Sequence, residues 1–201
     1  MTLDRAGWPF VAGLGVVTLL LLAFAPLLAA VGAVVLVFTL NFFRDPERNA
    51  PETENALISP ADGRIVRADA LRVSIFMNVF DVHVCRSPVA GRVMSVAHEP
   101  GRFLAAMRND ASERNERTAI VVQPPDGEPV RFVLVAGLVA RRIVCRVAAG
   151  RALRVGERVG IIRFGSRVDL DLPAGAAPTV RVGDRVVAGE TVVARRVQGA
   201  A

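Results

Sequence analysis

Arg163-Phe164-Gly165-Ser166-Arg167 is the stretch around which the rest of the sequence is organised. It follows an apolar run that starts at Val159, and it precedes an alternating run that contains Val168, Leu170 and Leu172. Alternation with a period of two is typical of β-strands, and a glycine inside such a pattern marks a bulge or a close approach of backbones. The stretch therefore predicts two strands that meet at a Gly-Ser bond, and a bulge with an exposed serine is its plain structural explanation.

The Gly165–Ser166 bond also permits a reaction of the chain with itself. The serine hydroxyl can attack the glycine carbonyl in front of it, which converts the amide to an ester. β-Elimination from that ester cuts the chain and leaves dehydroalanine, which hydrolyses to a pyruvoyl group. The pentapeptide alone favours the bulge, so the choice depends on the other motifs of the chain.

The sequence after a polar linker, Asn49–Asn55, consists of short strand patterns separated by Gly and Pro. The predicted strands are Gly63–Ala68, Arg72–Met77, His83–Cys85, Gly91–Ala97, Thr118–Gln123, Val130–Val139 and Ile143–Val147, followed by three or four more. Only Phe103–Asn109 offers a brief helical stretch. Short, evenly spaced strands with turn signals between them predict a mainly β fold, a short-stranded barrel or sandwich.

A weak internal repeat lies in the last part of the chain. Arg154-Val155-Gly156-Glu157-Arg158-Val159 recurs as Arg181-Val182-Gly183-Asp184-Arg185-Val186. Such units resemble the half-barrels of hammerhead-like domains, in which a glycine turn precedes a strand that crosses over. Two similar hairpins are the alternative explanation.

The N-terminal part is a long uncharged segment, from Trp8 to Phe43. It is too long for the apolar core of a signal peptide. A single helix over its most apolar part would be about 45 Å long, against about 30 Å for the hydrocarbon core of a bilayer. Pro26 lies near the middle and breaks or kinks a helix there. The segment predicts membrane attachment, either as one kinked span or as a helical hairpin in one leaflet. Basic residues on both flanks, Arg5 and Arg44, favour the hairpin with both ends on the cytoplasmic side.

Composition excludes several classes of protein. The net charge is +6 and the sequence pI is about 11.1, which suits an anionic membrane face or nucleic acid. Aromatic residues make up only 5% of the chain and no nucleic-acid motif is present, so we expect no nucleic-acid partner. All 25 basic residues are Arg, and a pyridoxal phosphate enzyme needs a Lys for its Schiff base, as lipoyl and biotinyl carriers need one to modify. Cys85 and Cys145 lie in apolar runs and predict buried thiols.

Two further stretches carry candidate chemistry. Asp62 lies in an Asp-Gly turn that leads into a strand, where it could simply be the side-chain acceptor of that turn. His83 is flanked by valines in a strand pattern, where a histidine is more often a core residue than a base. Asp81 shares a face with His83 by the period of two.

Taken together, the motifs of the chain resemble those of the phosphatidylserine decarboxylase family, and most closely its short, membrane-attached proenzyme branch. The motifs occur in the family's order, from about Phe42 to Leu172. They are S-P-A-D-G at 59–63, V-H-V-x-R-x-P-x-x-G at 82–91, P-G-x-F at 100–103, N-E-R at 115–117 and F-G-S at 164–166.

The resemblance implies a site and a cofactor. Ser166 would become a pyruvoyl group that forms a Schiff base with the substrate, and Gly165 would become a new C-terminus. Asp62 and His83 match the Asp and His that form the self-processing triad with this Ser. In the family's longer branch a second His stands where this chain has Phe80, so His83 could also return the proton to the substrate carbon. No pyridoxal phosphate and no metal are implied.

The implied organisation has two domains and two chains. Residues 1–48 would anchor the protein, and residues 49–201 would form the catalytic domain. Self-cleavage would give a β chain, 1–165, and an α chain, 166–201, which stay together as a heterodimer; a higher oligomer remains open. The implied activity is decarboxylation of phosphatidylserine to phosphatidylethanolamine at the cytoplasmic face of the cell membrane.

Arg117, Arg163 and Arg167 are candidates for binding the substrate's phosphate or carboxylate, because guanidinium groups pair with both. Two other classes of function remain open from the residues. One is a membrane-anchored Ser-His-Asp hydrolase without self-cleavage, although no G-x-S-x-G elbow is present. The other is a non-enzymatic β-barrel adaptor.

Overall fold

The computed structural model describes residues 2–102, 114–137, 142–163 and 166–196. The chain divides into two compact units, residues 1–47 and residues 48–201, and each is described by itself. The predicted helical stretch Phe103–Asn109 lies outside the described residues.

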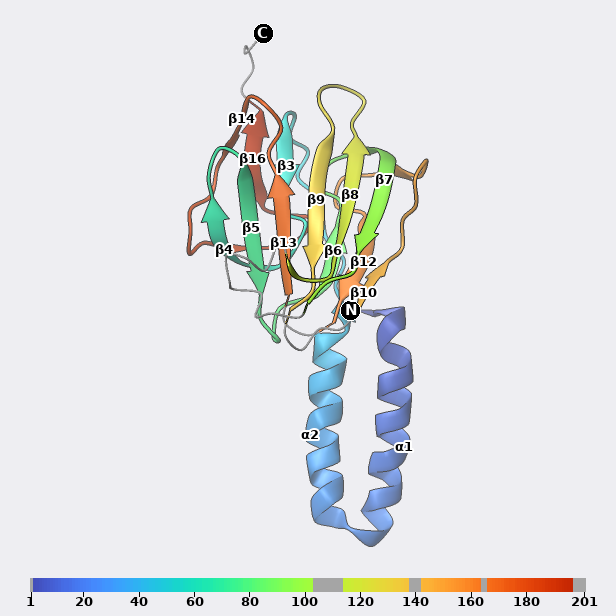
Figure 1. The fold of residues 1–201 in the computed structure, drawn as a ribbon. Coiled ribbons are helices and arrows are strands. Elements are labelled where there is room, and N and C mark those ends of the chain that lie inside the picture. Colours follow the sequence, from blue (N-terminus) through green and yellow to red (C-terminus); the bar gives the residue numbers. More distant parts are fainter. Residues whose placement is uncertain (1, 103–113, 138–141, 164–165, 197–201) are drawn as a thin grey trace. The chain divides into compact units, whose positions relative to one another are not determined.

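The first unit is a helical hairpin. Its elements are β1 (Thr2–Leu3), the 3-10 helix η1 (Arg5–Gly7), α1 (Trp8–Phe24), α2 (Pro26–Phe42) and β2 (Arg44–Asp45). The two helices lie side by side and antiparallel (Figure 1). The chain turns at Ala25, whose φ of −150° and ψ of 74° are not helical, and Pro26 begins the second helix because its missing N–H is not needed there. Of the two forms that the sequence left open, the structure has the hairpin.

The hairpin is apolar on its outer surface and closely packed between its helices. A Cβ added to Gly32 would lie 2.6 Å from Thr18 Oγ1, so the helix axes approach at this glycine. Large apolar side chains, among them Leu19 and Leu27, are exposed. Residues Arg5–Phe24 are long and apolar enough to cross a membrane, by length and composition only, and α2 is a shorter apolar helix.

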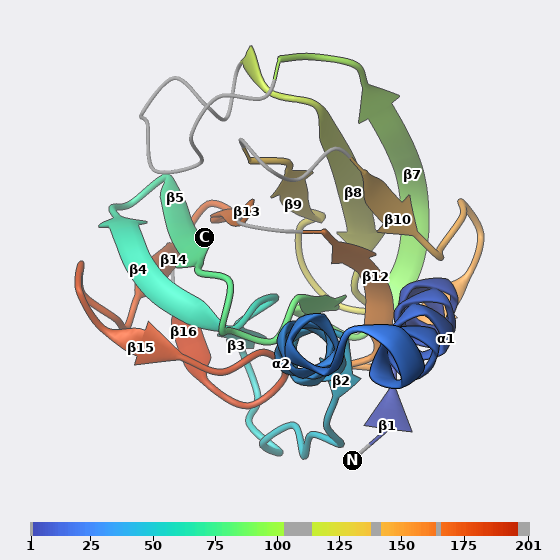
Figure 2. The same ribbon diagram turned by 90° about the horizontal axis from the view of Figure 1, so that it is seen from below.

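The described strands of the second unit form three sheets. The largest has the strand order β11-β7-β8-β9-β13-β5-β4-β15, and the two smaller ones have the orders β10-β12-β6 and β14-β16-β3. The strands are β3 (Ala56–Ile58), β4 (Gly63–Ala68), β5 (Arg72–Met77), β6 (Val84–Arg86), β7 (Gly91–Glu99), β8 (Arg117–Gln123), β9 (Val130–Val135), β10 (Ile143–Cys145), β11 (Ala152–Leu153), β12 (Arg158–Ile162), β13 (Ser166–Asp171), β14 (Ala176–Pro178), β15 (Arg185–Val186) and β16 (Val192–Arg196). Viewed from below, the long strands of the large sheet follow an arc (Figure 2).

The predicted mainly β class with a preceding apolar helical segment is confirmed. The predicted bounds of β4 and β5 agree with the structure, whereas β9 ends at Val135 and not at Val139 as predicted. Each sheet of described strands is open, so these strands form no closed barrel.

The internal repeat is present, but its copies differ from those that the sequence suggested. Hairpin β10–β12 corresponds to hairpin β14–β16. The last residue of the first strand pairs across each hairpin in the same way, Cys145 with Gly160 and Pro178 with Ala194. Both copies contain two glycine turns with positive φ. These are Gly150 (89°) and Gly156 (71°) in the first copy and Gly183 (100°) and Gly189 (76°) in the second. The sequence match had aligned the second turn of one copy with the first turn of the other.

Each repeated hairpin contacts an S-P-x-x-G turn in the same way. Gly156 N donates to Ser87 O and Gly189 N donates to Ser59 O, both at 2.9 Å. The two turns, residues 59–63 and 87–91, also bond to each other's strands, since Arg86 N donates to Pro60 O (2.9 Å) and Ile58 N to Pro88 O (3.0 Å). The second unit is therefore an intertwined duplication with an approximate two-fold relation, and only one of the two turns carries an aspartate, Asp62.

Opposite faces of the large sheet differ in chemistry. Val168 and Leu170 of β13 lie with Ile75 of β5 in the main core. The alternate residues Arg167 and Asp169 face the other way and are also buried. The period of two in these strands thus places an apolar layer and a charged layer on the two sides of one sheet.

On the charged face, carboxylates and guanidinium groups cross-link three strands. Arg167 Nε donates to Asp169 Oδ1 (2.6 Å), and Arg72 Nε and Arg131 Nη1 donate to the two oxygens of Asp171 (2.6 and 2.5 Å). Burial alone would lower the pKa of Arg72, but its hydrogen bond with Asp171 and the carboxylate charges raise it. These pairs tie β5, β13 and β9 together in the centre of the sheet.

Gly63 is required by the approach of two strands. A Cβ at this position would lie 2.1 Å from Phe76 O, and its φ is +145°. We expect Gly63→Ala to destabilise the domain by several kcal/mol, on the order of the cost of forcing backbone apart in a packed core. Gly150→Ala is the matched control, because its φ is +89° but no atom lies within 4 Å of the added Cβ. We expect this control to cost only about 1 kcal/mol. If urea unfolding showed equal losses of unfolding free energy in the two variants, the close approach at Gly63 would not be what requires the glycine.

Candidate functional site

Ser166 is the first residue of β13 and points to the core face of the large sheet. It pairs with Met77, the last residue of β5, and its Oγ lies 3.4 Å from Met77 Sδ. The side chain is fully buried. Because Val168 and Leu170 share its face, the hydroxyl is directed into the interior of the domain and is not the exposed serine of a simple bulge.

His83 lies immediately before β6 and is also fully buried. Its Nδ1 is 2.9 Å from Asp81 O. A carbonyl oxygen can only accept, so we assign the proton to Nδ1, which leaves Nε2 with its lone pair in the neutral ring. His83 is therefore held in the tautomer of a base.

The backbone brings the segments of His83 and Ser166 together. Ile162 N, at the end of β12, donates to His83 O (3.3 Å), and Ser166 follows four residues after Ile162. Met77, the partner of Ser166, lies six residues before His83. Ser166 and His83 are thus linked twice: through Met77, which pairs with Ser166, and through Ile162, which is bonded to His83.

Asp62 lies in the S-P-A-D-G turn and is held by two donors. Ala188 N donates to Oδ1 (2.7 Å) and Arg48 Nη2 donates to Oδ2 (2.9 Å). The turn that carries Asp62 is bonded to β6, since Arg86 N donates to Pro60 O (2.9 Å). Burial raises the pKa of the Cys85 thiol in this strand, and the charge of Asp62 raises it further. Cys85 is two residues from His83. The structure thus places Asp62 beside the strand that follows His83.

The tautomer of His83 is fixed by a group that the sequence did not indicate. Nδ1 faces the backbone carbonyl of Asp81. The Asp81 side chain is itself fixed, since Oδ2 accepts from Asn78 N and Oδ1 from Arg185 Nη2, both at 2.8 Å. A direct part for Asp62 in the reaction stays a prediction.

The motifs P-G and N-E-R meet near the start of β13. A Cβ on Gly101 would lie 2.5–2.6 Å from backbone atoms of residues 114–116, so this glycine permits the contact. Asn115, which is buried, donates from Nδ2 to Ala136 O (2.7 Å), and Ala136 N donates to Glu116 O (2.9 Å). Ala136 directly follows Val135, which pairs with Arg167. Asn115 and Glu116 are therefore bonded to the end of β9, next to the first residues of β13.

The three candidate arginines lie in different surroundings. Arg167 follows Ser166 but faces the opposite side of β13, where Asp169 Oδ1 (2.6 Å) and Ser74 Oγ (2.9 Å) accept from it. Arg117 lies in the same row of residues, paired with Val135, and forms an ion pair with Glu99. The structure does not bring these two side chains to the face of Ser166.

Arg163 is the remaining candidate, and it is half-buried between Ile162 and the start of β13. Gly165, the predicted cleavage partner of Ser166, lies outside the described residues. Within the described ranges, no group of three His, Cys, Asp or Glu residues could hold a metal ion.

The fold is thus a β domain with a buried serine at the head of a central strand and a buried histidine on a nearby segment. Comparisons with known proteins give the particular family. The profile of phosphatidylserine decarboxylase matches residues 35–194. The phosphatidylserine decarboxylase proenzyme of Paraburkholderia xenovorans is 47% identical, over 94% of this chain and 95% of its own length. The proenzymes of Ralstonia nicotianae and Burkholderia mallei are each 49% identical, over 94% of this chain and 94% and 93% of their own lengths. The chain belongs to the phosphatidylserine decarboxylase family.

Proposed function

We propose that this chain is a precursor that cuts itself between Gly165 and Ser166 and then decarboxylates phosphatidylserine to phosphatidylethanolamine and CO2. The observation that carries the proposal is Ser166, buried on the core face at the first residue of β13, next to the segment that holds His83. The names of the relatives, proenzymes of this activity, agree with it.

Self-cleavage uses groups of the chain alone. His83 Nε2 takes the proton of the Ser166 hydroxyl, and Oγ attacks the carbonyl carbon of Gly165. The C–N bond breaks, the nitrogen takes a proton and an ester forms. Removal of the Cα proton of residue 166 then forms a Cα=Cβ double bond and breaks the Cβ–Oγ bond, so that Gly165 leaves as a carboxylate and dehydroalanine remains. Water converts the dehydroalanine to a ketone with release of ammonia.

The two products remain one folded domain in this proposal. The central strand β13 belongs to the small chain and lies between β5 and β9 of the large chain. Two more strands of the small chain also pair with the large one, since β15 pairs with β4 and β16 with β3. The cut therefore leaves the sheet pairing of a heterodimer intact.

The surroundings of Ser166 fit a pyruvoyl group. Such a ketone supplies an electron sink for the loss of CO2 from an amine substrate, and it needs no added cofactor. The chain has no Lys that could compete with the substrate amine for the ketone. In this proposal His83 holds the proton that the substrate carbon receives. The half-buried Arg163 is the guanidinium we assign to the headgroup's phosphate or carboxylate.

The apolar hairpin would attach the enzyme to the membrane in which its substrate lies. Both ends of the hairpin meet in the β1–β2 pair, so both lie on one side. With the basic residues at these ends, we propose the cytoplasmic face.

The other two functions that the sequence left open are not favoured. A hydrolase or an adaptor would need neither a cut at Gly165 nor the motifs shared with the decarboxylase proenzymes. The relatives carry the decarboxylase name over nearly the whole chain.

Intact mass and product analysis test the proposed function. We expect two species, residues 1–165 and residues 166–201, the smaller with a ketone that hydroxylamine traps with loss of activity. Phosphatidylserine vesicles should release CO2 without added pyridoxal phosphate. A single full-length species in active membranes would contradict self-cleavage. Release of fatty acid or free serine without CO2 would replace the decarboxylase by a hydrolase.

Removing the hairpin tests membrane attachment. A protein that begins at Arg44 should become extractable by salt, because the attraction that remains is mostly electrostatic and therefore screened. It should still cut itself, since Asp62, His83 and Ser166 are all retained. Resistance of the shortened protein to both high salt and carbonate would place the anchor elsewhere.

A further inference from the structure

The turn between β5 and His83 exposes apolar side chains beside the site. Phe80 is 66% exposed and Val79 is 36% exposed, in a domain whose other large apolar residues are mostly buried. We call residues 78–81 the site turn. It directly connects Met77, the partner of Ser166, with the segment of His83.

The site turn is fixed by its own hydrogen bonds. Phe80 N donates to Asn78 Oδ1 and Asn78 N donates to Asp81 Oδ2, both at 2.8 Å, and Asp81 N donates to Asn78 O at 3.0 Å. These bonds hold the two apolar side chains at the surface of the turn. A rigid presentation of this kind lowers the entropy lost when the turn binds something.

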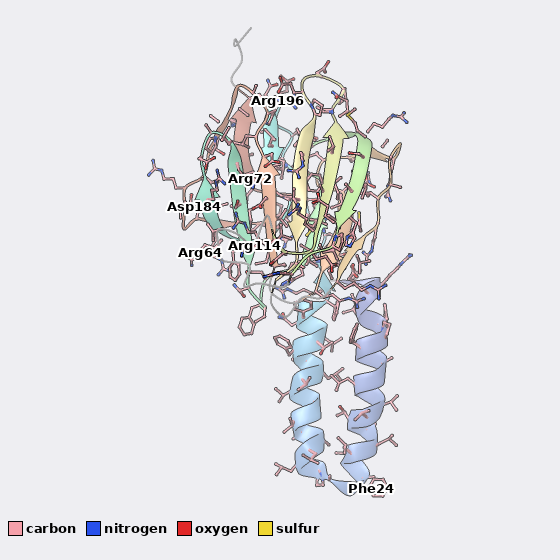
Figure 3. The ribbon with its side chains drawn as sticks, in the orientation of Figure 1. Phe24, Arg64, Arg72, Arg114, Asp184 and Arg196 are labelled. Atoms are coloured by element: carbon pink, nitrogen blue, oxygen red, sulfur yellow. The ribbon has the colours of Figure 1, made fainter. Side chains whose placement is uncertain are left out.

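Exposed cations accompany the apolar side chains. Arg185 donates from Nη2 to Asp81 Oδ1 (2.8 Å) and its side chain is 67% exposed. In the sheet, Arg185 of β15 lies opposite Arg64 of β4, which is also exposed. Arg64 in turn lies opposite Phe76, near the end of β5. Figure 3 shows Arg64 and Arg114 at one end of the β domain and Arg196 at the other. Arg185, Arg64 and the site turn therefore lie at the same end of the domain.

We propose that the site turn inserts into the surface of an anionic bilayer and holds the catalytic domain against the lipid headgroups. Aromatic and apolar side chains next to arginines are typical of protein surfaces that bind anionic lipid interfaces. This inference rests on the proposed function, because a lipid whose tails stay in the bilayer can reach Ser166 only if the domain contacts the bilayer next to the site. It adds a second membrane contact to the hairpin.

Tryptophan fluorescence in the full chain tests the contact. The chain has one Trp and no Tyr, so the double variant Trp8→Phe, Phe80→Trp has a single emitter. With vesicles that contain phosphatidylglycerol, an anionic lipid, we expect a blue shift and quenching by brominated acyl chains. The matched control is Trp8→Phe, Leu71→Trp, because Leu71 is 72% exposed and precedes β5 at its opposite end. This control should show neither effect.

Kinetics separate this proposal from the proposed function. Val79→Ser should raise KM for phosphatidylserine in vesicles about threefold or more through loss of part of the interfacial anchor. Its kcat, its self-cleavage and its KM for a water-soluble short-chain phosphatidylserine should stay unchanged. Unshifted fluorescence and an unchanged vesicle KM, with cleavage and CO2 release intact, would overturn the membrane contact alone. Loss of cleavage or CO2 release in the unaltered protein would overturn the proposed function instead.

A second, independent inference concerns Arg48. We infer that Arg48 is a positioning residue for Asp62. The side chains of Arg48 and Asp62 are only 15% and 13% exposed, and they form an ion pair at 2.9 Å. Close packing fixes the guanidinium's stem, because a Cβ on Gly189 would lie 3.4 Å from Arg48 Cβ. Ala188 N holds the other carboxylate oxygen, so the pair sets both the position and the charge of Asp62.

A double-mutant cycle on self-cleavage tests this role. Arg48→Gln should slow cleavage by about tenfold or more, because the partly buried carboxylate loses its cation. Arg48→Lys should restore part of the rate. Glu190→Gln is the matched control, because Glu190 is 3.7 Å from the same guanidinium but 40% exposed, and it should leave the rate unchanged. In an Asp62→Asn background, Arg48→Gln should have little further effect. If the losses of cleavage rate from Arg48→Gln and Asp62→Asn were additive in the double variant, Arg48 would act elsewhere than through Asp62.

Discussion

Replacing Ser166 with alanine is expected to leave one intact chain of 201 residues with no decarboxylase activity. Alanine has no nucleophile for the attack on Gly165, and without the cut no ketone can form at this position. The fold should survive, because the hydroxyl's contact within the described residues is the Met77 thioether and alanine fits a fully buried position. Denaturing gels, intact mass and CO2 release measure the outcome, and a thermal melt confirms folding.

His83→Gln is the companion to this variant. Loss of a general base slows a reaction by about 100- to 10,000-fold, so cleavage should become slow and not vanish. His98→Gln is the control, since His98 is half exposed and lies 3.1 Å from Thr118 Oγ1 on another part of the sheet. Cleavage of the Ser166→Ala chain at residue 165, or equal rates in the two histidine variants, would contradict the mechanism.

Asp169→Ala is expected to have the largest effect on stability. Its carboxylate is the partner of Arg167 on the buried charged face, and the two side chains are 1% and 5% exposed. Removing one partner of a buried pair leaves an uncompensated charge, which costs about 3–5 kcal/mol. For a domain of this size that loss lowers Tm by roughly 10 °C. Thermal melts of the Ser166→Ala chain with and without the change would measure it on a uniform, uncleaved species.

Asp171→Ala provides the comparison on the same strand. Asp171 is 26% exposed and its partners Arg72 and Arg131 are 26% and 41% exposed, so water can replace the lost carboxylate. We expect a loss of at most about 1 kcal/mol. If the two variants melted at the same temperature, burial would not be the property that makes the Arg167 pair important.

The parts of the fold that follow from local sequence were predictable. The bounds of β4 and β5 follow from alternation that ends at turn residues, and the break between α1 and α2 follows from Pro26. The register of the duplication was not predictable from the best sequence match. The two copies are equivalent through backbone hydrogen bonds of Gly156 and Gly189 with distant serines. Backbone bonds of this kind constrain side-chain identity only weakly.

The site shows the same division. Ser166 and His83 were predicted from specific motifs, and the structure places their segments near each other, while their roles stay predictions. That Arg167 faces away from Ser166 follows from the period of two once the strand is known to start at residue 166. The bonds of Arg48 and of the Asp81 carbonyl could not be predicted, since each joins residues through tertiary contacts or the backbone.

The central position of β13 has a consequence for the lifetime of the two-chain enzyme that we propose. Before the cut, β12 and β13 belong to one polypeptide, so β13 can enter the sheet between β5 and β9 at the high effective concentration of a short connection. After the cut, the same strand would have to find its place as a separate peptide, and refolding would depend on concentration. Unfolding of the mature protein should therefore be irreversible in dilute solution, and its lifetime should be set by a rate and not by an equilibrium.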